Sequence, residues 1–440
     1  MRSDLNSFDT DEILMGLRNH IEHQQPWQVS VVKSGLVVWS LMMLWLCWWS
    51  GIQHDYTWYL VQWRNLLEGS DPWGSGNAYG PLYTAIGFLL PLGPLAPKFL
   101  MVGAMLAANA VLVFELLHDR TMRPTQIIYL LAIPTNVLVV GAGVIYGLND
   151  AFVAGLLVTA ALLRHRGRFL ACGVFVGFAA LTKYYPLLLL PLFALDEGKV
   201  RWSVMAGGVI IFSSGFIAAL AIWGVGPLKP IYRGSIRGPT LLSAIKALQS
   251  VFGDEGAVGW LIRYNSCLVV SGVMAALLFS WKARVNWLEG VVIGYLVMLT
   301  LYKVGHPQFY LPWLFMVASL PLVGKRSADR MAIILLPAVL LLSLHQIVYQ
   351  FGSDSYNLEL QRYVGFIAFL VNTVSIAVCA VDLWMHRHGS GEPAQLVTGP
   401  VSNAHERCSL SSTMLGGSSR TKRPTARSAM HCNLSGNSCI

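Results

Sequence analysis

Long uncharged apolar stretches dominate this chain and decide the environment in which it can fold. The run from Gly35 to Gly51 carries no charged side chain. With its flanks it reaches the length of about 20 apolar residues that a membrane-spanning helix needs. Comparable stretches recur at 99–117, 126–147, 151–163, 169–195, 203–225, 266–281, 288–302, 309–324, 331–349 and 363–385. We therefore expect an all-α polytopic membrane protein with roughly 10 to 12 transmembrane helices, some of them broken.

The composition and the placement of charge agree with this expectation. Of the 440 residues, 55% are hydrophobic and only 12% are charged, which is too little polar surface for a water-soluble globule. The net charge of +9 could suggest a nucleic-acid partner. However, Arg and Lys gather in short loops at 118–123, 164–168, 198–201, 281–284 and 324–330. That is the positive-inside pattern, so we expect these loops in the cytoplasm and no nucleic-acid partner.

The domain organisation follows from the ends of the chain and from the alternation of spans. Residues 1–33 lack the basic, apolar and small-residue order of a signal peptide, so we expect a cytoplasmic N-terminal segment. Residues 34–386 form the predicted transmembrane domain. Residues 387–440 are rich in Ser, Gly, Thr and Arg, which predicts a disordered basic cytoplasmic tail. The loop after the first span then faces outward, as do KYYP, the 227–262 loop, KVGHPQFY and 350–361.

Between Gly51 and Arg164 the predicted topology is consistent only if one apolar segment is broken. Four apolar segments lie between Gly51 and Arg164, where an outside start and an inside end require an odd number of crossings. Gly80 to Pro97 is the candidate, because its prolines and glycines remove helix hydrogen bonds that lipid cannot replace. Such backbone is tolerated where protein or a cavity covers it. Here, and at Pro186 to Pro191, we expect a groove for a lipid chain.

Several polar residues lie on the predicted outer side. Asp55 directly follows the first span and opens HDYTWYLVQW, an amphipathic aromatic stretch that predicts a helix at the membrane surface. Its carboxylate either caps that helix or acts on a substrate arriving from the lipid. Asp71 in DPW is most simply a turn or cap residue. Of Asn149 and Asp150 in YGLND, helix capping accounts for one.

Outward-facing cations form a second group. Lys183 lies inside the apolar stretch 169–195, and such a residue either faces a cavity and meets an anion or extends to the interface. Lys303 and His306 in YKVGHPQFY make a natural phosphate clamp. The 227–262 loop adds outward positive charges that an anionic substrate would explain: Lys229, Arg233, Arg237 and Lys246. One carboxylate with several cations at the outer face suggests chemistry on a lipid phosphate.

The order of these features resembles the polyprenyl-phosphate-dependent membrane glycosyltransferases of the C-type fold, especially glycosyltransferase family 87, the mannosyltransferase-like group. The resemblance spans most of Val31 to about Gln350. It rests on Asp55 with Tyr59 as D-x-x-x-Y, on GSDPW, YGPLY, ACGVFVGFAALTKYYP and KVGHPQFY. The match departs at Leu148, where the family tends to have Gln, and at Gly80, where a second Pro is common.

The resemblance implies transfer of a hexose, expected to be mannose, from a polyprenyl-phosphate sugar to a hydroxyl of a lipid or glycan acceptor in cell-envelope glycan synthesis. Asp55 would be the general base. The donor phosphate would be bound by Lys183, His306, Lys303, Arg233 and Arg237. Other substrate contacts would come from Tyr59, Asp71, Tyr79, Asn149, Asp150, Tyr184 and Gln308. With cations stabilising the leaving phosphate, neither a metal nor another cofactor is expected.

Other functions remain open from the sequence. A transporter or flippase for a lipid-linked sugar would also use cations and broken helices, although the chain has no convincing internal repeat. A polymerase or ligase for lipid-linked glycans would likewise need an outer base and phosphate-binding cations. A non-catalytic scaffold would leave Asp55, Lys183 and His306 far apart. On the preferred hypothesis, the protein lies in the cytoplasmic (plasma) membrane with its active site facing outward.

Overall fold

The computed structural model describes residues 26–74, 76, 78–118, 136–236, 239–240, 243–253, 255–351 and 355–389. These residues belong to one compact unit, Met1–Gly389. They form helices joined by short turns, with one antiparallel pair of two-residue strands, β1 (Leu195–Asp196) and β2 (Lys199–Val200). The tail predicted at 387–440 lies almost entirely outside the described residues.

Most of the described residues lie in helices. Their bounds are α2 (Pro26–Trp49), α3 (His54–Leu67), α4 (Pro81–Ile86), η1 (Gly87–Leu92), α5 (Ala96–His118), η2 (Val139–Ile145), α7 (Asn149–His165), α8 (Phe169–Thr182), α9 (Pro186–Ala194), α10 (Trp202–Trp223), η3 (Gly226–Leu228), α11 (Lys229–Ile236), α12 (Ala244–Phe252), α13 (Gly256–Arg263), α14 (Asn265–Lys282), α15 (Trp287–Leu301), η4 (Pro307–Phe309), α16 (Tyr310–Ser319), η5 (Leu320–Val323), α17 (Arg326–Phe351) and α18 (Ser355–Gly389).

Six of the described helices are long and apolar enough to cross a membrane: Val29–Trp49, Ala96–Leu117, Trp202–Trp223, Asn265–Lys282, Arg326–Gln350 and Glu359–His386. A seventh span forms if η2 and α7, which meet at a bend of 106°, cross together. The chain is therefore an all-α, multi-pass integral membrane protein. Among the described residues, the other members of the roughly 10 to 12 helices expected, some of them broken, are not full-length spans. Other apolar stretches form shorter helices of 10–17 residues: Pro81–Leu92, Phe169–Thr182, Trp287–Leu301 and Pro307–Val323.

Prolines and glycines bound several of the shorter helices. α8 stops before Lys183, and α9 begins at Pro186, which suits the first position of a helix. The segment 80–97, expected to be broken, forms the short pieces α4 and η1, and Pro91 lies inside η1. Gly93 follows with φ 135°, a conformation that residues with a side chain rarely adopt.

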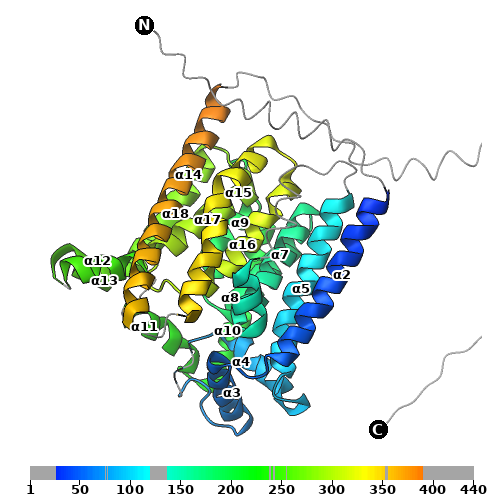
Figure 1. Ribbon diagram of the computed structural model, residues 1–440, viewed down its shortest axis with the longest axis vertical. Coiled ribbons are helices and arrows are strands. Elements are labelled where there is room, and N and C mark those ends of the chain that lie inside the picture. Colours follow the sequence, from blue (N-terminus) through cyan, green and yellow to red (C-terminus); the bar gives the residue numbers. More distant parts are fainter. Residues whose placement is uncertain are drawn as a thin grey trace, which may run out of the picture. The chain divides into compact units, whose positions relative to one another are not determined.

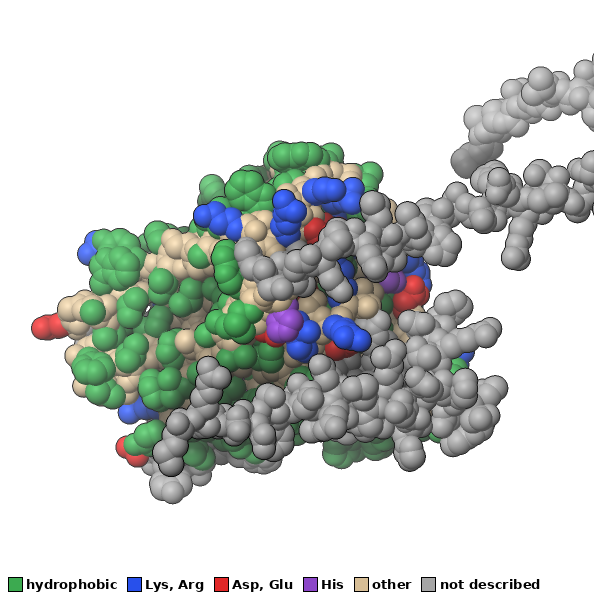
Figure 2. All heavy atoms as spheres, turned by 90° about the horizontal axis from the view of Figure 1, so that it is seen from above, with side chains coloured by type: hydrophobic (Ala, Val, Ile, Leu, Met, Phe, Trp, Pro, Cys, Tyr) green, Lys and Arg blue, Asp and Glu red, His purple; other side chains and the backbone are tan. Residues whose placement is uncertain are grey.

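Figure 1 shows that the start of α2 and the end of α18 lie at one end of the bundle, whereas α3 and α11 lie at the opposite end. We call the end that carries α3 and α11 the outer end, after the orientation that the sequence predicts. Two of the segments expected to face outward, the one after the first span and the start of the 227–262 loop, therefore share an end (Figure 1). Figure 2 views the other end, where Lys and Arg side chains gather, while hydrophobic side chains cover the flanks. Arg166 pairs there with Glu115, and Arg330 Nε lies 3.0 Å from Asp382 Oδ1.

Glycines bring α8 and α10 into close contact. A Cβ on Gly173 would lie 2.0 Å from the Val204 carbonyl oxygen, and one on Gly207 would lie 2.3 Å from the Leu170 carbonyl oxygen. Membrane helices associate through such small residues, because lipid provides no hydrophobic drive between them. The glycines of the ACGVFVGF motif thus have a packing role.

Gly173→Ala is expected to destabilise the folded protein by about 1–3 kcal/mol, because the new methyl group meets backbone that can move only if α8 and α10 separate. Gly103→Ala in α5 is the matched control, since a Cβ there meets nothing within 4 Å. Thermal unfolding in detergent measures both. Equal midpoints for the two variants would contradict the packing role.

Candidate active site at the outer end of the bundle

Four interruptions of helical structure come together towards the outer end. The Gly80 amide donates to the Thr182 carbonyl at 2.9 Å, which joins the start of α4 to the end of α8. At Gly80, a Cβ would lie 2.2 Å from the Leu181 carbonyl oxygen, so this contact requires glycine. The junction of η2 with α7 and the turn that contains η4 complete the set, and η2 contacts η4. Irregular backbone inside a membrane bundle typically lines a binding site.

A buried ion pair lies among these interruptions. Lys183 Nζ is 2.6 Å from Asp150 Oδ2, and the two residues are 5% and 0% exposed. Asp150 lies in the first turn of α7, where the helix dipole favours a negative charge, and Lys183 caps the end of α8. Lys183 Nζ also lies 4.5 Å from the centre of the Phe309 ring. The anion that Lys183 meets is thus part of the protein, and the side chain does not extend to the interface.

Phenol groups surround this pair. The hydroxyls of Tyr59 and Tyr79 are 3.2 Å apart, and the Tyr79 ring lies 5.4 Å from Lys183 Nζ. The Tyr295 hydroxyl donates to the Tyr185 hydroxyl at 2.8 Å, and Tyr185 interacts in turn with the Asp150 carboxylate. Burial raises the pKa of Tyr59 well above its ordinary value, so its hydroxyl stays protonated. Sequence reasoning named Tyr184 in KYYP rather than its neighbour Tyr185, and it missed Tyr295, which lies within an uninterrupted apolar helix.

Asp55 lies one helical turn before Tyr59 of this cluster. It occupies the first turn of α3, is partly buried, and interacts electrostatically with Tyr146, which precedes α7. The N-cap of α3 is Gln53, so Asp55 is not the capping residue. The helix predicted after the first span is confirmed, whereas its location at the membrane surface stays a prediction. One face of the helix buries Tyr56, Tyr59, Leu60 and Trp63.

Lys98 holds the end of α2 against the end of η2, a role that sequence reasoning did not anticipate. It is fully buried, and its Nζ lies 2.7 Å from the Ile145 carbonyl oxygen and 2.9 Å from that of Gly51. The same ammonium group lies 2.9 Å from Ser50 Oγ and 3.2 Å from the Cys47 carbonyl oxygen. A cation at the carboxyl ends of α2 and η2 satisfies carbonyl groups that the helices leave unpaired.

Lys98→Met is expected to cost about 1.5–3 kcal/mol for each charge-assisted hydrogen bond that is not replaced. The loss would also loosen the connection from α2 to α3 that holds Asp55. Thermal unfolding measures the effect, with Lys282→Met as the control because Lys282 is exposed. A midpoint for Lys98→Met as high as that of the control would show that water replaces the ammonium group without cost.

Three other predicted site residues have protein partners of their own. Asp71 Oδ1 accepts a hydrogen bond from the Trp73 amide at 2.9 Å, and Asp71 forms an ion pair with Lys229. This agrees with the simpler interpretation of Asp71 as a turn residue. The Tyr184 hydroxyl donates to the Pro227 carbonyl at 2.7 Å. Lys303 is 2% exposed, and its Nζ lies 3.4 Å from the Ile262 carbonyl oxygen.

The structure describes only some of the remaining predicted residues. The His306 ring lies 6.0 Å from that of Phe309, which links it to Lys183, and Gln308 is half-buried in η4. Arg233 lies in α11, but its side chain is outside the described residues, as is all of Arg237. The roles assigned to all these residues stay predictions. The structure thus brings together Asp150, Lys183, Tyr59 and Tyr79.

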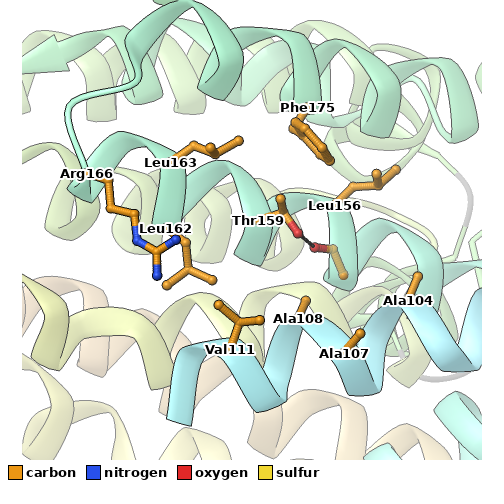
Figure 3. A pocket seen from close by; sticks show the side chains of 11 residues that line it. Ala104, Ala107, Ala108, Val111, Leu156, Thr159, Leu162, Leu163, Arg166 and Phe175 are labelled. Atoms are coloured by element: carbon orange, nitrogen blue, oxygen red, sulfur yellow. Dashed lines mark hydrogen bonds between the residues drawn. The ribbon is translucent and has the colours of Figure 1, made fainter. Parts of the chain in front are cut away.

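A groove of about 330 Å³ lies between α5, α7 and α8, and none of the predicted site residues lines it (Figure 3). Its walls are largely apolar, and Arg166, which pairs with Glu115, lies at one end. The lining residues are Ala104, Ala107, Ala108, Val111, Gly155, Leu156, Thr159, Leu162, Leu163, Arg166 and Phe175. The groove expected at Pro81–Pro97 and Pro186–Pro191 is a different place and stays a prediction.

Comparisons of the chain with protein-family models, with curated proteins and with solved structures gave no match.

Proposed function

We propose that this protein is a hexosyltransferase that uses a polyprenyl-phosphate sugar as donor and works at the outer face of the membrane. The observation that carries the proposal is the position of Asp55 in α3, where it interacts with Tyr146 and precedes by one turn Tyr59, a member of the buried polar centre at the interrupted helices. Buried ionisable residues are costly in a membrane protein and usually mark a functional site. A lipid-linked donor brings both an apolar chain and a phosphate to such a site.

Asp55 is the general base in this proposal. Its carboxylate takes the proton of the acceptor hydroxyl as that oxygen attacks the anomeric carbon, and the bond from this carbon to the phosphate oxygen breaks. The phosphate leaves with the electron pair, and His306 with the cations of the 227–262 loop stabilises its charge. Because Asp150 balances the charge of Lys183, Lys183 serves mainly as an oriented hydrogen-bond donor. That the chain has the C-type fold and is related to glycosyltransferase family 87 is part of the same proposal.

A transporter or flippase for a lipid-linked sugar is the second candidate. A buried Asp150–Lys183 pair at the interrupted ends of α7 and α8 is the kind of centre that transporters use. A transporter leaves the bond between sugar and phosphate intact, whereas a transferase breaks it.

The experiment follows a radiolabelled polyprenyl-phosphate hexose in membranes with and without the chain. Transfer requires that label appear in a product that no longer carries polyprenyl phosphate, and only when the chain is present. Label that crosses sealed vesicles while still attached to polyprenyl phosphate would favour the transporter and overturn the proposed function.

A further inference from the structure

Two buried polar side chains on α17 have no hydrogen-bond partner among the described residues. His345 and Gln346 are each 1% exposed, yet both ring nitrogens of His345 and Oε1 of Gln346 are unpaired there. Most buried polar groups in proteins are hydrogen-bonded. These side chains therefore need hydrogen-bond partners that the described residues do not provide.

Both residues lie near the outer end of the bundle. His345 precedes Phe351, the last residue of α17, by six positions, or about 9 Å along the helix. Its ring lies 6.2 Å from that of Tyr310, and it interacts electrostatically with His306. One turn further along α17, the Tyr349 ring lies 5.6 Å from that of His306. His345 thus lies deeper in the bundle than the turn that carries the predicted phosphate ligands Lys303 and His306.

Gln346 lies against η2, which is a π-helix. A Cβ on Gly141 would lie 3.0 Å from Gln346 Nε2, so glycine lets the side-chain amide approach the η2 backbone. Asn136 Nδ2 donates to the Val339 carbonyl at 3.2 Å, which holds α17 beside the start of η2. π-helical turns occur frequently at functional sites.

The elements next to His345 and Gln346 also carry residues of the candidate active site. η4 contributes Phe309, whose ring lies near both Lys183 Nζ and His306. η2 leads to Asn149, which is 0% exposed and whose side-chain oxygen and nitrogen are also unpaired among the described residues. The unpaired polar atoms therefore lie on elements that meet around η2 and η4.

We propose that His345 and Gln346, together with Asn149, bind the hydroxyl groups of the donor sugar, an inference that rests on the proposed function. A neutral imidazole offers one donor and one acceptor, and an amide offers both, which matches hydroxyls that donate and accept. The carbonyl oxygens of Gln346 and Asn149 would repel a phosphate. The groups that bind the sugar are thus distinct from those that bind the phosphate.

The test compares two lipids on the purified full chain: a polyprenyl-phosphate hexose and polyprenyl phosphate without sugar. The wild-type protein is expected to bind the sugar-bearing lipid at least about 10-fold more tightly, the preference that one or two hydrogen bonds provide. His345→Phe and Gln346→Met are expected to remove that preference and to retain binding of polyprenyl phosphate. Gln350→Met, at an exposed position of the same helix, is the control and should keep the preference.

Thermal unfolding separates sugar binding from a structural role. His345→Phe should unfold at the same or a higher temperature, because an apolar ring replaces a polar one that lacks a partner. A lower midpoint with the sugar preference intact would mean that buried water satisfies His345 and would overturn the inference. If His345→Phe does not fold, His345→Gln, which keeps a donor and an acceptor, must change the preference between two epimeric hexoses, and an unchanged preference overturns the inference.

The outcomes also separate this inference from the proposed function. A wild-type chain that binds neither lipid overturns the proposed function and this inference with it. A wild-type preference for the sugar-bearing lipid that survives both substitutions overturns only the assignment of His345 and Gln346.

Discussion

Asp55→Asn is expected to lower hexose transfer by about 10²- to 10⁴-fold, the contribution typical of a general base. The amide keeps the size and shape of the carboxylate but cannot take the proton of the acceptor hydroxyl. Because Asp55 is not the N-cap of α3, folding should change little. The measurement is initial transfer rate from a radiolabelled polyprenyl-phosphate hexose, at equal amounts of folded protein.

The matched control is Glu68→Gln, which removes an exposed carboxylate at the C-cap of the same helix and should leave transfer unchanged. Donor binding should survive Asp55→Asn, since the base contacts the acceptor. A variant that transfers at the wild-type rate would remove Asp55 from the mechanism and make Asp71 and Asp150 the next carboxylates to test. A variant that fails to bind donor would indicate a role in positioning.

Asp150→Asn is expected to destabilise the protein by about 3–5 kcal/mol, because it leaves the ammonium group of Lys183 buried without its counter-ion. Lys183→Met should cost a similar amount, since it leaves the carboxylate of Asp150 unpaired. The double substitution Asp150→Leu with Lys183→Met should recover most of the stability, because it removes both buried charges together. It should not recover transfer, which the proposed function makes dependent on Lys183 as an oriented donor.

Thermal unfolding and transfer rate are measured on the same preparations. Glu115→Gln is the control, because it breaks the exposed pair with Arg166, and such pairs contribute at most about 1 kcal/mol. Additive losses in the double variant would show that Asp150 and Lys183 do not act as a pair. Full transfer by a stable double variant would place the pair outside the mechanism.

Helix boundaries could be predicted wherever the signal is local. The first span and the helix that follows it could be predicted because uncharged apolar runs and an aromatic amphipathic stretch are patterns of neighbouring residues. The break at 80–97 was likewise predicted from its prolines and glycines. Hydropathy alone could not show which of the expected helices span the membrane in full, because it does not show whether an apolar stretch forms one helix or two short pieces.

The sequence by itself determined that this is a multi-pass membrane protein, which ends of its helices carry positive charge, and which polar residues interrupt its apolar stretches. Those properties depend on composition and short-range pattern. Only the tertiary structure decided that Lys183 pairs with Asp150, that Lys98 joins the ends of α2 and η2, and that Gln346 lies against η2 with His345 beside Tyr310. These partners are far apart in the chain, and their meeting depends on how the interrupted helices pack.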